Sequence, residues 1–150
     1  MSKSPYILAI DQGTSSTRAA LIDKNGIIID QESVEFKQIY PANGWVEHDP
    51  LEIMQTVKST ITTIFERNKI IQNDILSCGI TNQRETIVAW DKVTGKPLYN
   101  AIVWQDRRTQ NICQNLVDKD YTNLIQEKTG LIIDPYFSAS KIQWLLENIK

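Results

Sequence analysis

Metal-binding and redox-active side chains are scarce in this sequence. Its 150 residues contain one histidine and two cysteines. Cys78 and Cys113 are too few and too poorly spaced to form a metal site. Cys78 lies in an apolar run and Cys113 in a predicted helix, so we expect both to be buried, reduced thiols and the protein to be cytoplasmic. His48 stands beside Asp49 with no suitably placed serine or cysteine nucleophile, so we interpret it as a local capping residue rather than part of a catalytic triad.

Long apolar runs and an excess of charge of one sign are also missing. No apolar run approaches the roughly 18 residues of a membrane span, and no signal-peptide core precedes Tyr6. The formal net charge is −2, with 41% hydrophobic and 23% charged residues. A nearly balanced charge argues against bulk binding to nucleic acid or to an anionic membrane, because both need a basic patch. The length allows one ordinary domain, or part of a larger one, with a substantial core.

Three strands joined by two short turns are predicted at the N-terminus. The strands span Tyr6–Ile10, Thr17–Ile22 and Ile27–Glu35. Gly13 allows a tight reversal between the first two, and the Asn-Gly pair of Asp23-Lys24-Asn25-Gly26 is a strong hairpin signal between the second two. The segment therefore predicts an antiparallel meander of three strands.

A mixture of helices and strands is predicted after the meander. Asp49 and Pro50 begin a helix whose apolar residues recur at helical spacing, so we expect this face in the core: Met54, Val57, Ile61, Ile64 and Phe65. Later strands are expected at Ile75–Thr81, Ile87–Trp90 and Ala101–Trp104, and later helices at Thr109–Val117, Tyr121–Lys128 and Ser138–Ile149. The result is an α/β fold with a mixed sheet and flanking helices.

The last predicted helix is amphipathic and has no polar tail after it. Its apolar residues on one face are Ile142, Leu145, Leu146 and Ile149. Because domain boundaries usually fall in polar linkers, we expect the sequence to be truncated.

The segment from Asp11 to Arg18 carries the clearest chemical signal. A buried strand ends in Asp11, and Gly13 is followed by four hydroxyl residues, Thr14 to Thr17, and then Arg18. Backbone N–H groups and small hydroxyls crowded into one turn suit a phosphate, and a carboxylate at the strand end can hold Mg²⁺ beside it. The same residue types also make ordinary hairpin turns, and the Walker pattern is absent. On local grounds both interpretations stay open.

Arg84 and Glu85 come after the end of a predicted buried strand. Ligands of α/β proteins bind at the ends of the strands. A guanidinium offers paired donors and a carboxylate offers paired acceptors, and the neighbouring hydroxyls of a small polyol need both. The alternative is a surface turn with two solvated charges.

Aromatic residues near two other predicted turns are further candidates. Trp104 at the end of a strand can form an apolar wall against ligand C–H groups, or it can be a core tryptophan. Tyr136 can offer a hydroxyl to a polar substrate, whereas we expect its neighbour Phe137 to pack. The charged run Asp106-Arg107-Arg108 can equally be the first turn of the next helix.

Together these motifs resemble the glycerol kinase family, one of the carbohydrate kinase families in the actin-like ATPase superfamily. The resemblance covers essentially the whole chain in the family's order. It rests on four segments: Asp11–Arg18, Asn82–Thr86, Ile102–Thr109, and Thr129-Gly130-Leu131 with Asp134-Pro135-Tyr136-Phe137-Ser138. The first segment is shared loosely by many sugar kinases, whereas Arg84-Glu85, Trp104 and the last segment are more specific to glycerol.

The resemblance implies a role for each candidate residue. Arg84 and Glu85 would bind the glycerol hydroxyls, Tyr136 would add a hydrogen bond, and Trp104 would line the carbon backbone. The nucleotide phosphates of ATP would meet Gly13, Thr14, Ser15, Ser16 and Arg18, and Asp11 would help to hold Mg²⁺. Position 15 is Ser where many family members have Thr, which keeps the hydroxyl.

The resemblance also implies a ribonuclease-H-like fold and parts beyond this sequence. Family members are several times longer and enclose ATP between two lobes, so residues 1–150 would be the N-terminal part of the first lobe. The aspartate that serves as general base would lie beyond residue 150. We therefore expect the full-length enzyme to phosphorylate glycerol to sn-glycerol 3-phosphate, and these 150 residues alone to be inactive.

Two other functions remain alternatives from the sequence. One is a kinase of a different polyol or sugar on the same scaffold. The other is a non-catalytic binding module that kept the fold. Whether the full-length protein is a homo-oligomer stays open.

Overall fold

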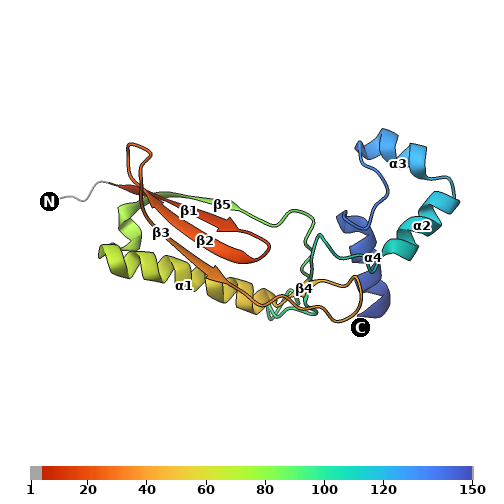
Figure 1. Cartoon of the computed structure of the whole chain (residues 1–150), viewed down its shortest axis with the longest axis horizontal. Coiled ribbons are helices and arrows are strands. Elements are labelled where there is room, and N and C mark those ends of the chain that lie inside the picture. The colour runs from red at the N-terminus through yellow and green to blue at the C-terminus, as the bar shows by residue number, and fades with distance from the viewer. Residues whose placement is uncertain (1–4, 150) are drawn as a thin grey trace. The chain divides into compact units, whose positions relative to one another are not determined.

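The N-terminal meander is present and is extended by a fourth strand. In the computed structural model, which describes residues 5–149, β1 (Tyr6–Gln12), β2 (Ser16–Ile22) and β3 (Ile28–Glu35) pair antiparallel. β5 (Ile75–Thr81) then pairs parallel with β1, which gives the order β3-β2-β1-β5 (Figure 1). The predicted mixed sheet led by an antiparallel meander is therefore confirmed.

The chain divides into two units. The first contains Met1–Lys37 and Leu51–Gln83, and the second contains Gln38–Pro50 and Arg84–Lys150. The four-stranded sheet and most of helix α1 (Pro50–Asn68) belong to the first unit, together with the short 3-10 helix η1 (Gln72–Asp74). No helix within residues 5–149 is both long enough and apolar enough to span a membrane.

The turn between β2 and β3 forms as the Asn-Gly signal predicts. Gly26 has a φ of 80°, and the Asp23 carboxylate accepts hydrogen bonds from the backbone N–H groups of Asn25 and Ile27 at 2.8 and 2.9 Å. These bonds lower the pKa of Asp23, the bond from Ile27 most of all. The side chain thus fixes the hairpin and its register.

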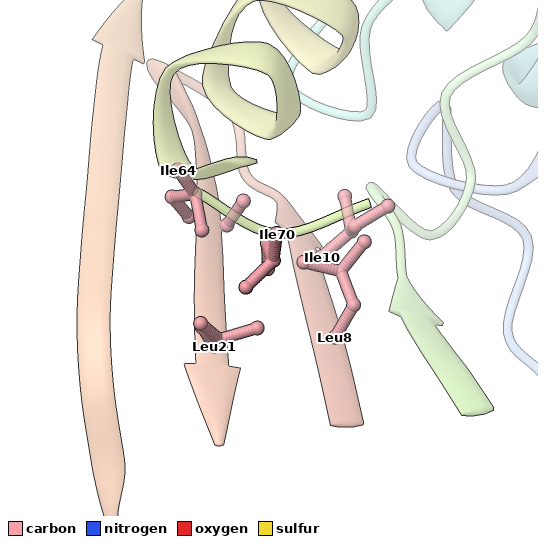
Figure 2. Close-up of a cluster of buried hydrophobic side chains, with 6 residues drawn as sticks. Leu8, Ile10, Leu21, Ile64 and Ile70 are labelled. Carbon is pink, nitrogen blue, oxygen red and sulfur yellow. The ribbon is translucent and has the colours of Figure 1, made fainter. Parts of the chain in front are cut away.

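Helix α1 packs its buried side chains on one face of the sheet. The core is formed by Leu8, Ile10, Ala19, Leu21, Ile64 and Ile70, five of which are labelled in Figure 2. The buried residues of the helix, Thr56, Thr60 and Ile64, follow one another at a spacing of four. The two threonines bond the carbonyls of Ile53 and Val57, respectively, which satisfies their hydroxyls inside the protein.

The predicted core face of α1 is confirmed except at one position. Ile64 is buried, and Val57, Ile61 and Phe65 pack against the core. Met54 is 52% exposed, so that part of the prediction is wrong. The buried stripe passes through the two threonines instead, because their hydroxyls find partners within the helix.

β5 has the expected bounds but not the expected burial. Only Ile75 is partly buried, whereas Leu76 and Ile80 are each 73% exposed. Cys78 is exposed on the same strand, so the prediction of a buried thiol is wrong there and right for Cys113. Among the described residues β5 is an edge strand, and an apolar sequence alone does not reveal that position.

The second unit contains a two-stranded sheet and three helices. β4 (Glu47–His48) pairs antiparallel with β6 (Ala101–Ile102). The predicted helices are confirmed as α2 (Gln110–Asp118), α3 (Thr122–Thr129) and α4 (Ser138–Asn148). The predicted strand at Ile87–Trp90 is wrong, since only isolated bridges from Ile87 to Ile102 and from Trp90 to Pro97 form there.

Candidate functional site

The turn between β1 and β2 is closed by its own backbone. The N–H of Gly13 donates to the carbonyl of Ser16 at 3.0 Å, and Gln12 Nε2 donates to the carbonyl of Gly13 at 3.1 Å. A Cβ at position 13 would lie 3.1 Å from that Ser16 oxygen, which is tighter than ordinary packing allows. A side chain at position 13 would therefore displace the Ser16 carbonyl by a few tenths of an ångström, and the tight turn presents Thr14 and Ser15 at its tip.

The hydroxyl residues after Gly13 divide into two groups. Thr17 is fully buried, and its Oγ1 bonds Gln12 Oε1 at 2.6 Å and Thr56 Oγ1 at 2.7 Å. Ser15 is exposed, while Thr14 and Ser16 are half-buried. Thr17 thus attaches the start of β2 to α1, and the other three hydroxyl residues remain at the surface of the turn.

Asp11 and Arg18 lie opposite each other on β1 and β2, and both are exposed. Directly opposed residues of an antiparallel pair project from the same face of a sheet. Together with Thr81 they line an open hollow of about 310 Å³ whose other lining residues are apolar: Ala9, Ile10, Ala20, Gly79 and Ile80. One carboxylate and one guanidinium therefore stand at the edge of the hollow, beside the hydroxyl-rich turn.

Glu85 has an unusual backbone and a firmly held side chain in the second unit. Its φ is 64°, a region that non-glycine residues seldom adopt. Its Oε2 accepts hydrogen bonds from the backbone N–H of Ser138 at 2.9 Å and from Ser138 Oγ at 2.6 Å. Ser138 is the first residue of α4, so this carboxylate caps a helix N-terminus.

Tyr136 connects the other aromatic candidates. Its ring lies 5.9 Å from that of Trp104 and 5.1 Å from that of Phe137, and both contacts are edge to face. Its N–H donates to Asp134 Oδ1 at 2.7 Å, and the N–H of Trp104 donates to Thr86 Oγ1 at 3.2 Å. The structure thus places Trp104 beside Tyr136, with Phe137 packed as predicted.

Lys141, which the sequence did not single out, joins Glu85 to Tyr136. Its Nζ donates to the carbonyl of Glu85 at 2.7 Å and to the carbonyl of Tyr136 at 2.6 Å. The lysine is fully buried on α4, whereas Ile142 and Leu146 of the predicted apolar face are 46% and 80% exposed. The available signal was the spacing of Lys141 from Trp144 and Leu145, which places it on the inner side of the helix.

Arg84 is exposed and makes no hydrogen bond or ion pair with residues 5–149. Arg84 is assigned to the candidate site because it is adjacent to Glu85 in the sequence. Of the four predicted polyol residues, the structure therefore brings together Glu85, Trp104 and Tyr136. The predicted phosphate residues all lie in the first unit and the polyol residues in the second.

A buried ionic cluster supports the turn that follows Trp104. The side chain of Arg108 has no exposed area and bonds Glu47 at 2.7 Å and Asp106 at 2.8 Å. Its guanidinium lies 3.9 Å from the ring centroid of Trp45 and 4.6 Å from that of Trp144. Burial lowers the pKa of Arg108, but hydrogen bonds with Asp106 and Glu47 outweigh burial and raise it. The interpretation of Asp106-Arg107-Arg108 as the first turn of the next helix is wrong, because α2 begins at Gln110.

His48 lies in the two-residue strand β4. It is fully buried, and its Nε2 is 2.7 Å from Gln38 Oε1. β4 pairs with a segment far away in the sequence, which the local pattern around His48 did not predict.

Comparison with known proteins gives a consistent result. Residues 6–150 match the N-terminal domain of the FGGY family of carbohydrate kinases. The chain is 57% identical over 145 residues to a glycerol kinase of Rhizobium meliloti and 54% identical to one of Thermoanaerobacter sp., covering 97% of this chain and 29% of each relative. The chain thus spans less than a third of the length of these relatives.

Solved structures agree with the sequence relatives. The crystal structure of Plasmodium falciparum glycerol kinase with ADP superposes with a TM-score of 0.92 at 41% identity. A ligand-bound xylulose kinase from Lactobacillus acidophilus gives a TM-score of 0.86 at 26% identity. The two superpositions cover 97% and 96% of this chain and 29% of each solved chain.

Proposed function

This chain belongs to the FGGY family of carbohydrate kinases, and we propose that the full-length protein transfers the γ-phosphoryl group of ATP to a hydroxyl of glycerol. The product is sn-glycerol 3-phosphate. The observation that carries the proposal is the grouping of Glu85, Trp104 and Tyr136 in one unit. Relatives named glycerol kinase that are more than half identical to this chain support the choice of glycerol.

Glu85 and Arg84 bind the glycerol hydroxyls in this proposal. Ser138 donates both of its hydrogen bonds to Oε2 of Glu85, and Oε1 makes no hydrogen bond with residues 5–149. That oxygen accepts a hydrogen bond from one substrate hydroxyl, while the Arg84 guanidinium donates to the hydroxyl oxygens. Since vicinal hydroxyls each donate and accept, two adjacent side chains of opposite type recognise a short polyol.

Trp104 and Tyr136 complete the polyol site in this proposal. The indole covers the C–H groups of the substrate, and the phenol hydroxyl adds one hydrogen bond. The edge-to-face contact between the two rings supports this assignment, because each ring limits the rotation of the other.

The turn after β1 takes the nucleotide phosphates in this proposal. Gly13, Thr14, Ser15 and Ser16 supply backbone N–H groups and hydroxyls, and Arg18 supplies positive charge. Among residues 5–149 no group of three His, Cys, Asp or Glu side chains could hold a metal. Asp11 alone fits Mg²⁺, which keeps several waters and binds through one or two carboxylates plus phosphate oxygens. Bound Mg²⁺ neutralises phosphate charge during transfer.

We place residues 1–150 in the N-terminal part of the first lobe and the general base outside them. The helix α4 N-terminus holds Glu85, and we assign Asp11 to the phosphate side, so neither takes the proton from the substrate. The 150 residues alone are therefore expected to show no turnover. The two free thiols, Cys78 and Cys113, support a cytoplasmic location.

The test is a coupled phosphoryl-transfer assay of the full-length protein with Mg·ATP. Glycerol, other short polyols, xylulose and gluconate are compared, because solved xylulose and gluconate kinases share the fold. The highest kcat/KM is expected for glycerol. A higher kcat/KM for a sugar or sugar acid would replace glycerol as the substrate, and no transfer to any of them would favour a non-catalytic module.

A further inference from the structure

Lys141 places a buried ammonium group between two segments of the proposed polyol site. Glu85 lies in a loop far from α4 in sequence, and Tyr136 lies two residues before the first residue of α4. The Nζ atom bonds the backbone carbonyls of both residues, at 2.7 and 2.6 Å, and lies 6.0 Å from the centroid of the Tyr136 ring. One side chain therefore fixes the backbone of two residues that carry substrate contacts.

Glu85 needs such support because its backbone is strained. A φ of 64° is unfavourable for a residue with a Cβ and persists only where the surroundings hold it. Helix α4 holds Glu85 at both ends, since Ser138 bonds the carboxylate and Lys141 bonds the carbonyl. A small change of φ at Glu85 would change the direction in which its carboxylate points.

The surroundings of Lys141 account for a lysine at a fully buried position. A buried ammonium is unfavourable unless it is hydrogen-bonded, and here two carbonyl oxygens accept from it. Burial lowers its pKa to about 8, while Glu85, Asp106 and Asp134 favour the charged form. The group is thus mostly charged at neutral pH and makes its strongest hydrogen bonds there.

We propose that Lys141 is a positioning residue of the polyol site, which aligns Glu85 with Tyr136 through their backbone carbonyls without touching the substrate. This inference rests on the proposed function for the identity of the substrate. It goes beyond the proposed function because Lys141, which does not contact the substrate, sets the relative positions of two residues that do.

The test compares Lys141→Met with Leu145→Ala in the full-length protein. Met fills similar space but cannot donate to the carbonyls, so the KM for glycerol is expected to rise at least about 10-fold and kcat/KM to fall by up to about 100-fold. The KM for ATP stays within about twofold, because the phosphate residues lie in the other unit. Leu145, one helical turn further along α4, is also buried, so its truncation lowers the melting temperature but leaves the KM for glycerol unchanged.

Equal changes of KM in both variants, or no change in Lys141→Met, would overturn the proposal. If Lys141→Met does not fold, Lys141→Gln is measured instead. Its amide can donate to one carbonyl, so the KM for glycerol is expected to rise about threefold to 10-fold, and a wild-type KM would overturn the proposal.

A crystal structure separates this inference from the proposed function. If the wild-type protein phosphorylates another polyol, the KM comparison is made with that polyol. If it phosphorylates none, the proposed function fails, and the structure of Lys141→Met, or of Lys141→Gln if Met does not fold, still tests the positioning role. Glu85 is expected to leave its positive φ there, and an unchanged Glu85 backbone would overturn the role.

Discussion

Ser138 donates two hydrogen bonds to a single oxygen of Glu85, from its backbone N–H at 2.9 Å and from its Oγ at 2.6 Å. One oxygen of the Glu85 carboxylate is thereby bound to the N-terminus of α4. This attachment fixes the direction in which the other oxygen points. The start of a helix thus orients a side chain that we propose binds substrate.

Ser138→Ala removes one of these two bonds and leaves the backbone bond in place. Because a neutral donor to a carboxylate contributes on the order of 1 to 2 kcal/mol, the KM for glycerol is expected to rise about fivefold to 30-fold. Steady-state kinetics of the full-length protein measures this, and the KM for ATP is the internal control. An unchanged KM for glycerol would show that the backbone bond alone orients Glu85.

Arg84→Ala removes the guanidinium from the proposed polyol site. The KM for glycerol is expected to rise strongly, by about 100-fold, since a charged donor to the substrate is lost, while the KM for ATP stays nearly the same. Lys92→Ala, which removes another exposed cation of the same unit, is the matched control and is expected to change neither value. An unaltered KM for glycerol in Arg84→Ala would remove this residue from the site.

Gly13→Ala tests the turn that we assign to the phosphates. The new Cβ would lie 3.1 Å from the Ser16 carbonyl oxygen, so the turn must open and its own hydrogen bond must lengthen. The KM for ATP is expected to rise about 10-fold and the KM for glycerol to stay within twofold. If both values match those of the wild type, the phosphate contacts do not depend on this turn.

Glu47→Gln weakens the buried cluster around Arg108. The substitution leaves a fully buried guanidinium with one carboxylate partner, so the free energy of unfolding is expected to fall by about 2 to 4 kcal/mol. Glu32→Gln is the matched control, because its ion pair with Arg67 has the same 2.7 Å length but lies at the surface. It is expected to cost less than about 1 kcal/mol in the same denaturant titration, and equal losses would contradict a special role for burial.

Local patterns in the sequence were enough to predict the strands and the long helix of the first unit and the helices of the second. The alternation of β1 to β3, the Asn25-Gly26 turn and the helical spacing in α1 depend on neighbours within a few residues, and the structure confirms them. β4 could not be found this way. Glu47 and His48 are polar, form a strand of only two residues, and are buried by pairing with a distant segment.

Buried charges were the main omission at the candidate site. Arg108 and Lys141 were not predicted inside the protein, because charged side chains are mostly exposed. Their burial depends on distant partners, Glu47 for Arg108 and Glu85 for Lys141, which no local period reveals. The sequence therefore indicated the residues of the proposed polyol site but not the charged residue that joins Glu85 to Tyr136.

The pH dependence of stability tests the buried state of Lys141. Its pKa is about 8 in the folded protein against 10.5 for an ordinary lysine. Between these values the unfolded chain binds a proton that the folded chain has released, so raising the pH favours the folded state. Below pH 8 Lys141 is protonated in both the folded and the unfolded state. The full free-energy cost of burying its charge then applies, so the lysine destabilises the fold most in this range.

The difference in melting temperature between the wild type and Lys141→Met should therefore shift in favour of the wild type from about pH 8 to pH 10. Both proteins are compared with Cys113→Ser in place, because the Cys113 thiol, whose pKa burial raises, interacts with the Lys141 ammonium and its titration would not cancel in the difference. Glu85, Asp106 and Asp134 act on the ammonium in the opposite sense to burial, because each of them favours its charged form. A difference that is flat across this range would mean that Lys141 titrates like an exposed lysine and is not enclosed as the structure shows.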